Sequence, residues 1–279
     1  MGFDIGKTKS LFLFDAVIVM HYKVCNISFS IRTHLQLDPC WNQFSLCHLN
    51  APDFLIDIKK GVHVGYGIEM LEMGTCHMFF RNHATFMSAT PAWERISIYI
   101  SDDLSNYTGF VLQAFHTHAV RRQMIQLHAA TIEDQGRGIL FLGPSGIGKT
   151  TQAERWAEFR GASIINGDVG FVQRTEREYI AWGTPWHGSS PYCLNASVPV
   201  KALVVLKQAP ENRLRELTGF EKVSEIAGSV FYPTWLEDGM ELCTDTLNHL
   251  LTDLPVYRLD NRADRESVEI LAKELDRIT

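Results

Sequence analysis

A glycine-rich segment carries the clearest chemical signal in this sequence. It fulfils the pattern G-x-x-x-x-G-K-[ST] and consists of Gly143, Pro144, Ser145, Gly146, Ile147, Gly148, Lys149, Thr150 and Thr151. In a loop of this kind, backbone N–H groups surround a polyphosphate, the lysine brings a positive charge to its outer oxygens, and the hydroxyl after the lysine ligates Mg²⁺. The segment therefore predicts a binding site for ATP or another nucleoside triphosphate, with Lys149 acting in catalysis and Thr150 at the metal.

An acidic residue is expected close to this loop. Ala162 to Asn166 is predicted as a strand that ends at Gly167-Asp168. An acid in that place can orient and deprotonate an acceptor hydroxyl or belong to the metal shell, so Asp168 is a candidate for both roles. The structural alternative is a turn or capping carboxylate, since Asn-Gly-Asp is favourable turn sequence.

A second unusual segment spans residues 182–190. It combines two tryptophans, two glycines and a histidine in a predicted loop. We interpret it as a substrate-side loop in which Thr184, His187 or Ser189 contacts phosphate or acceptor. The alternative is that the tryptophans cap a core and that the Gly-Ser part is a flexible connection.

Two other groups of residues are candidates for this chemistry. His116 and His118 resemble a metal pair, but residues two apart on a helix do not share a face, so solvated or capped histidines are favoured. An additional cation could assist a transferring phosphate, and the sequence does not choose among Lys201, Arg213, Arg215, Arg258 and Arg262.

The apolar patterns predict the strands and helices around these residues. The run Ile139 to Leu142 is predicted as a strand entering the loop, and residues 151–159 as the helix leaving it, ended by Gly161. Leu127 to Glu133 is predicted to pair with the first of these strands as a hairpin. A hairpin at this place favours a mixed sheet, because ordinary phosphate-loop proteins have parallel neighbours there.

The remaining elements complete a predicted α/β fold with a mixed sheet around the phosphate loop. Further strands are expected at 179–182 and 201–206, and helices at 109–126, 221–227, 236–251 and 263–278, with the first helix packing on the elements C-terminal to it. Residues 22–100 show only short β-like segments, at 24–31, 54–58, 77–80 and 96–100. We therefore predict a smaller β-rich region over 1–108 and a nucleotide-binding domain over 109–279, in extensive contact with each other.

Composition limits the classes of function. A net charge of −6 argues against general nucleic-acid binding, which depends on neutralising phosphates. The apolar run from Leu11 to Met20 is too short to span a bilayer and lacks a typical cleavage site, so an edge strand or an upstream extension is expected there. Six cysteines without a C-x-x-C pair are ordinary for a reducing compartment, and we expect a cytoplasmic protein without membrane contact.

These motifs, in this order, resemble the HPr serine kinase/phosphorylase and phosphoenolpyruvate carboxykinase superfamily. The resemblance covers about Leu127 to Val172 and continues more vaguely to Leu206; it rests on His128 before the hairpin, the G-P-S-G-I-G-K-T-T loop and Asn166-Gly167-Asp168 after the next strand. It implies that His128 lies beside the terminal phosphate, although a lone strand histidine is otherwise usually structural. The family turn has two adjacent acids, whereas Asp168 is flanked by Gly167 and Val169, which puts reverse phosphorolysis in doubt.

The length fits the HPr kinase-like group, and the chain is also similar to the bacterial serine kinases that tailor lasso peptides. The resemblance implies an ATP- and Mg²⁺-dependent kinase that phosphorylates a hydroxyl, in first place a seryl hydroxyl, of a peptide, protein or small molecule. A nucleotide-binding regulatory module, or an ATPase in peptide maturation, is the alternative. HPr kinases are hexamers, but no C-terminal match extends this to a homo-oligomer here.

Overall fold

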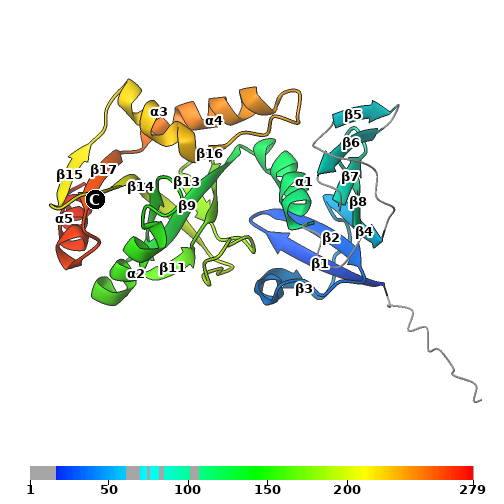
Figure 1. Cartoon of the computed structure of the whole chain (residues 1–279), viewed down its shortest axis with the longest axis horizontal. Coiled ribbons are helices and arrows are strands. Elements are labelled where there is room, and N and C mark those ends of the chain that lie inside the picture. The colour runs from blue at the N-terminus through cyan, green and yellow to red at the C-terminus, as the bar shows by residue number, and fades with distance from the viewer. Residues whose placement is uncertain (1–16, 61–69, 74–75, 82–84, 101–106, 279) are drawn as a thin grey trace, which may run out of the picture.

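A computed structural model describes residues 17–60, 70–73, 76–81, 85–100 and 107–278. They form two β-sheets, and helix α1 (Thr108–Val120) lies between them (Figure 1). The predicted edge strand around residues 11–20 falls largely outside the described residues; the first described strand begins at Ile18. None of the described helices has the length and apolar character needed to cross a bilayer.

The N-terminal sheet has eight strands in the order β3-β1-β2-β4-β8-β7-β6-β5. Their bounds are β1 Ile18–Val24, β2 Ile27–Thr33, β3 Ser45–Leu46, β4 Phe54–Lys60, β5 Met70–Met73, β6 Cys76–Arg81, β7 Thr85–Ala89 and β8 Arg95–Ile100. The short 3-10 helix η1 (Pro39–Phe44) precedes β3. The β-rich character of this region is confirmed. The single segment predicted at 24–31 is wrong, because Cys25 has φ 54 and turns the chain between two strands.

The helix predicted at 109–126 also ends earlier than expected. Gln123 has φ 56, which no α-helix accommodates, so Met124 and Ile125 belong to the next strand, β9 (Met124–Asp134). Strand β10 (Arg137–Leu142) then pairs antiparallel with β9. The predicted hairpin is thus present, with its turn at Gln135 and Gly136, whose φ values are 55 and 79.

The second sheet is mixed, as predicted, and has the order β10-β9-β12-β13-β14-β17-β15, with β11 and β16 also paired to β9. Only the β10–β14 and β14–β17 pairs are parallel among its described pairings. The bounds are β11 Ser163–Asn166, β12 Val169–Arg174, β13 Tyr179–Trp182, β14 Ser197–Gln208, β15 Arg213–Glu216, β16 Val230–Phe231 and β17 Val256–Asn261.

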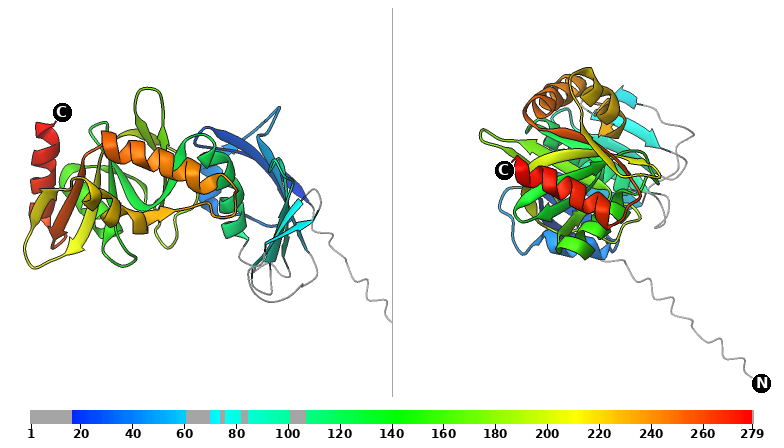
Figure 2. Two further views of the ribbon diagram at one scale, coloured as in Figure 1. Left: turned by 90° about the horizontal axis from the view of Figure 1, so that it is seen from above. Right: turned by 90° about the vertical axis from the view of Figure 1, so that its left-hand side faces the viewer.

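Helices cover both faces of this sheet (Figure 1). The helices are α2 (Lys149–Arg160), α3 (Phe220–Ile226), α4 (Gly239–Asp253) and α5 (Arg265–Arg277); a 3-10 turn, η2 (Ala227–Ser229), comes directly after α3. Alternate residues of β10 face opposite ways: Leu140 and Leu142 pack with α3 and α4, whereas Ile139 and Phe141 pack with α2 and α5. Helix α5 lies at the end of the molecule remote from the N-terminal sheet (Figure 2).

One apolar cluster connects the two sheets. It contains the buried side chains of the N-terminal sheet and of α1, and extends to Phe171 of β12 and Trp186 of the loop after β13. The Phe115 ring lies 5.1 Å from Phe171 and 5.0 Å from Trp186, and Trp41 of η1 lies 5.3 Å from Trp186, all between ring centroids. Helix α1 therefore packs on the N-terminal sheet as well as on the second one, and the expected contact between the two parts is confirmed.

Candidate functional site

The glycine loop has a backbone shape that only glycines favour. Gly143, Gly146 and Gly148 have φ values of 137, 78 and 105, and α2 begins directly afterwards at Lys149. A Cβ on Gly146 or Gly148 would meet no atom within 4 Å, so the backbone there faces open space. The loop therefore presents peptide groups at a helix N-terminus, an arrangement that suits an anion.

Lys149 lies folded over this loop. Its Nζ donates to the carbonyl oxygens of Gly143 at 3.1 Å and Pro144 at 3.3 Å, and the residue is only 6% exposed. Burial lowers the pKa of Lys149, and the negative charge of Asp168 partly offsets this effect. A phosphate at the loop would offer this ammonium group a stronger acceptor than two neutral carbonyls.

His128 and Asp168 lie in ion-pair contact next to the loop, and both groups are charged when the imidazole is protonated. Val169 pairs with His128 between β12 and β9, and His128 Nε2 lies 2.9 Å from Asp168 Oδ1. The hydrogen bond from His128 is the main cause that holds the pKa of Asp168 below its usual value; burial opposes it, and Lys149 and His187 add to it. Asp168 is therefore a carboxylate at neutral pH, able to accept a proton or bind a cation.

Asn166 holds the turn that carries Asp168. It is fully buried, and its Oδ1 accepts from the backbone N–H groups of Asp168 at 2.8 Å and Val169 at 2.9 Å. Its Nδ2 donates to the carbonyl oxygens of Thr184 and Trp186, each at 3.0 Å. The sequence indicated Asn166 only as a turn-forming residue; the Asn-x-Asp spacing was the available sign of this Asx turn.

The two predicted metal-binding residues lie close to each other. Thr150 Oγ1 donates to the carbonyl oxygen of Gly167 at 3.3 Å, which places the hydroxyl beside the turn of Asp168. Mg²⁺ in nucleotide sites takes one or two protein oxygens together with phosphate oxygens and water. A hydroxyl and an ionised carboxylate beside the glycine loop fit that requirement.

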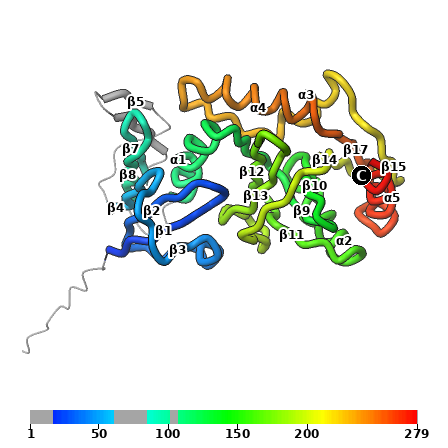
Figure 3. Tube along the Cα trace, turned by 180° about the vertical axis from the view of Figure 1, so that it is seen from behind, coloured from blue at the N-terminus to red at the C-terminus, as the bar shows by residue number. Residues whose placement is uncertain are grey.

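The loop of residues 182–190 begins at the end of β13 (Figure 3) and packs against the Asp168 turn. Thr184 is fully buried, and its hydroxyl donates to the Val169 and Trp186 carbonyls, so its placement does not fit the predicted substrate contact. His187 is partly exposed, and its charge contributes to the low pKa of Asp168. Gly188 lies directly against Asp168, and Ser189 is exposed at the tip.

A pocket of about 340 Å³ lies beside the glycine loop. It is lined by Gly146, Ile147, Gly148, Thr151, Gln208, Ala209, Asn261, Arg262 and Ala263. Of the five cations considered from the sequence, Arg262 lines this pocket, although it also pairs with Asp264 at 2.9 Å and Glu266 at 2.6 Å. Gln208 and Asn261 were not identified from the sequence, because they end β14 and β17, which meet the loop only in the folded sheet.

The histidines of α1 do not form a metal pair: His116 is buried rather than solvated, whereas His118 is capped by a backbone carbonyl, as the alternative predicts. His116 is 1% exposed, and its ring lies 5.6 Å from Phe171 and 5.5 Å from Trp235 between centroids. Burial lowers the pKa of His116 to about 3. His118 Nε2 lies 2.9 Å from the carbonyl oxygen of Trp93. Both side chains are thus packing residues, since α1 is covered on both sides.

Comparison with known proteins gives one family. A family model described as SynChlorMet cassette protein ScmC matches residues 106–259, more than half of the chain. No curated protein matches. Among solved structures, the Hpr(Ser) kinase/phosphatase from Coxiella burnetii is similar at 13% identity and a TM-score of 0.34, over 53% of this chain and 94% of that one. That likeness is too distant to carry an argument, whereas the family match spans the glycine loop, His128 and Asp168: the chain belongs to the ScmC family of SynChlorMet cassette proteins.

Proposed function

We propose that this protein is an ATP- and Mg²⁺-dependent kinase that transfers a phosphoryl group to a hydroxyl, with seryl hydroxyls as the first acceptor class. The observation that carries the proposal is the ion pair of His128 and Asp168 beside a glycine loop with a buried lysine. A general anion site needs the loop and the lysine, but it does not need an ionised carboxylate in the same place. Phosphoryl transfer needs the anion site and the carboxylate together, because it depends on positioning of the acceptor and on neutralisation of the phosphate charge.

Each part of the site has a separate task in this proposal. Residues 143–151 and Lys149 bind the phosphates, and the pocket lined by Gln208, Asn261 and Arg262 accepts the nucleoside. Thr150 and Asp168 would hold Mg²⁺, which when bound neutralises charge on the phosphate oxygens. Binding would also release Lys149 from the loop carbonyls, so that its charge is directed to the nucleotide.

Asp168 has the second task of orienting the acceptor. Its free oxygen takes the hydroxyl proton as the acceptor oxygen bonds to the terminal phosphorus. The bond from that phosphorus to the bridging oxygen breaks at the same time, so that ADP leaves with the electron pair and the proton rests on the carboxylate. His128 keeps this carboxylate ionised and directed through the 2.9 Å contact. Asn166 fixes the backbone on which both depend, so His128 and Asn166 are positioning residues.

The test is phosphorus NMR of the purified chain with ATP and Mg²⁺. Serine, threonine and seryl peptides would be offered, including peptides encoded near the gene, because the family is described as a cassette protein. Lys149→Ala and Asp168→Asn are the site variants. Asp245→Asn is a matched control, since its side chain is 61% exposed and pairs with His249 on α4, outside the site.

A new phosphomonoester signal that both site variants lose and the control keeps is the expected result. Full transfer by Asp168→Asn would refute the mechanism. The absence of a second acid next to Asp168 favours one other candidate, a nucleotide-binding regulatory module or an ATPase in peptide maturation. Nucleotide binding without turnover would favour the module, and ADP with free phosphate alone would favour the hydrolase.

A further inference from the structure

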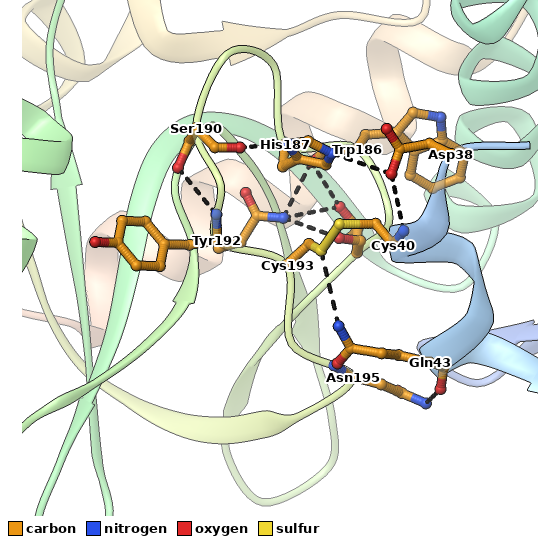
Figure 4. The surroundings of a disulfide bond; sticks show 11 residues. Asp38, Cys40, Gln43, Trp186, His187, Ser190, Tyr192, Cys193 and Asn195 are labelled. Atoms are coloured by element: carbon orange, nitrogen blue, oxygen red, sulfur yellow. Dashed lines mark hydrogen bonds and ion pairs between the residues drawn. A yellow bond between two sulfur atoms is a disulfide. The ribbon is translucent and has the colours of Figure 1, made fainter.

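A disulfide joins the two parts of the molecule. It connects Cys40 of η1 with Cys193 of the loop between β13 and β14, 153 residues apart in the sequence (Figure 4). This pair was not expected, because the cysteine pattern indicates unpaired thiols. Around it, Gln43 Nε2 lies 3.8 Å from Cys193 Sγ, and Asn195 Nδ2 donates to the Gln43 carbonyl at 2.7 Å. The two segments are therefore held together by polar contacts as well as by the sulfurs.

Two further potential metal ligands converge on the same place. The ligand atoms of Cys40, His187 and Cys193 all lie within 4.8 Å of one another, the one such group of three among the described residues. Asp38 comes from the same turn as Cys40, and its Oδ1 lies 3.7 Å from His187 Nε2 (Figure 4). Two sulfurs, one imidazole nitrogen and one carboxylate oxygen are a complete tetrahedral ligand set for zinc.

The hydrogen bond of His187 prepares its other nitrogen for a metal. Nδ1 is hydrogen-bonded to the backbone carbonyl oxygen of Ser190. A carbonyl oxygen can only accept a hydrogen bond, so Nδ1 carries the hydrogen. In the neutral ring, Nε2 then has a free lone pair, and this nitrogen is the one that faces Asp38. Metal-binding histidines typically have their second nitrogen donating to a carbonyl or carboxylate in this way.

We propose that in the dithiol state Cys40, Cys193, His187 and Asp38 bind one zinc ion, and that the disulfide is the metal-free, oxidised state of the same site. A dithiol reductant supplies two electrons and two protons, which break the S–S bond and leave two thiols. Zinc then displaces both thiol protons and is bound by two thiolates. The two states exclude each other, because the sulfurs bonded to one another are not thiolate ligands.

The position of this site links it to the Asp168 turn. Cys193 forms a β-bridge with Asn166, and Leu194 donates its N–H to the Ile165 carbonyl at 2.8 Å. A change of the separation between the sulfurs would therefore act on the backbone next to Asn166. The zinc proposal itself stands without the kinase proposal, since its ligands and its test do not involve nucleotide.

The test is metal binding by the full chain. The protein is reduced with a phosphine, freed of metal, and titrated with Zn²⁺ against a chromophoric chelator, and with Co²⁺ for the absorption of a tetrahedral thiolate complex. One equivalent of Zn²⁺ is expected in the reduced chain, and none after oxidation. Cys40→Ser, Cys193→Ser and His187→Gln are each expected to weaken binding by at least about tenfold. Cys47→Ser is the matched control, because Cys47 is an exposed free thiol near Cys40 in sequence.

Three results would overturn the proposal as a whole, and a fourth would overturn its ligand set. These are equal zinc binding by the reduced and oxidised chains, equal binding by the Cys40→Ser and Cys47→Ser variants, or a Co²⁺ spectrum without sulfur-to-metal charge transfer. His187→Gln without effect would also overturn the ligand set as stated. His187→Gln leaves both cysteines in place, so it keeps the test decisive if a cysteine variant fails to fold.

Discussion

Replacing Gly188 with alanine would push a methyl group into the Asp168 carboxylate. A Cβ at this position would overlap Asp168 Oδ2 and lie 2.8 Å from its Cγ, whereas ordinary contact begins at 3.4 Å. Restoring ordinary contact with Oδ2, the nearest atom, requires a shift of roughly 1 Å in the carboxylate or the loop. Misplacement of a reacting group by about 1 Å can cost about 100-fold in rate, so we expect a loss of phosphoryl transfer of about 10- to 100-fold.

Gly136→Ala is the matched control for this variant. Gly136 has φ +79 and Gly188 φ +58, so both alanines carry a left-handed backbone penalty of about 1–2 kcal/mol. A Cβ at Gly136 would meet no atom within 4 Å, and its hairpin is remote from Asp168. The two variants should therefore lose similar free energy of unfolding in urea, while only Gly188→Ala loses activity.

The assay compares phosphoryl transfer, nucleotide affinity and the His128 ring resonances in both variants. The affinity for nucleotide without Mg²⁺ should stay close to that of the unchanged chain, because Gly188 lies outside residues 143–151. The His128 resonances should move in Gly188→Ala, since the ion pair at 2.9 Å is disturbed. Transfer and His128 resonances equal to those of Gly136→Ala would show that the exposed loop yields instead, and would refute the reasoning.

Three further predictions concern stability. Asn166→Ala leaves two buried N–H groups and two carbonyls without their present partner, so urea unfolding should show a loss of about 2–4 kcal/mol; a loss under about 1 kcal/mol would contradict the assigned bonds. The His116 pKa of about 3 lies below the unfolded value, so its contribution is complete above about pH 6.5 and falls on acidification. Between pH 7 and pH 5 the free energy of unfolding of the unchanged chain should fall by about 2 kcal/mol more than that of His116→Leu. The same pH dependence in both proteins would contradict the low pKa of His116. Reduction of the Cys40–Cys193 disulfide in the absence of metal should lower the free energy of unfolding by roughly 2–5 kcal/mol. Reductant should leave the stability of Cys40→Ser unchanged, and thermal unfolding with and without reductant measures both.

Secondary structure was predictable where one signal dominates. The helix of residues 151–159 and its end at Gly161 are confirmed, because Gly161 has φ 70 and its N–H bonds back to Ala157. The boundary between α1 and β9 was not predictable, since apolar residues continue through Met124 and Ile125. Strands β12 and β17 were missed. In β12, Val169 to Val172 are all buried, which removes the alternation that marks a strand. In β17 buried residues alternate with partly exposed ones from Tyr257 onward, but over too few residues to stand out in the sequence.

The candidate site also contains residues that the sequence predicts and residues whose roles depend on contacts distant in the sequence. The glycine loop is contiguous, so its residues and their spacing are written in one segment of sequence. His128 and Asp168 are forty residues apart, and only the order of motifs connected them; their ion pair depends on the register of β9 and β12. The substrate contact predicted for Thr184 does not fit its burial. Its hydroxyl is hydrogen-bonded to Asn166, and the sequence around Thr184 does not reveal that partner.

The N-terminal region, in which the sequence shows no chemical motif, is connected to Asp168 by two sets of contacts. Trp41 packs on Trp186, whose carbonyl accepts from Asn166, and Asn166 in turn holds the N–H of Asp168. A second path runs from Cys40 through Cys193 to the same asparagine. Both paths begin in η1, so a partner or a redox change that moves η1 acts on the backbone of Asp168 without touching the glycine loop. Under the proposed function, nucleotide binding and phosphoryl transfer should therefore respond separately to changes in the N-terminal region.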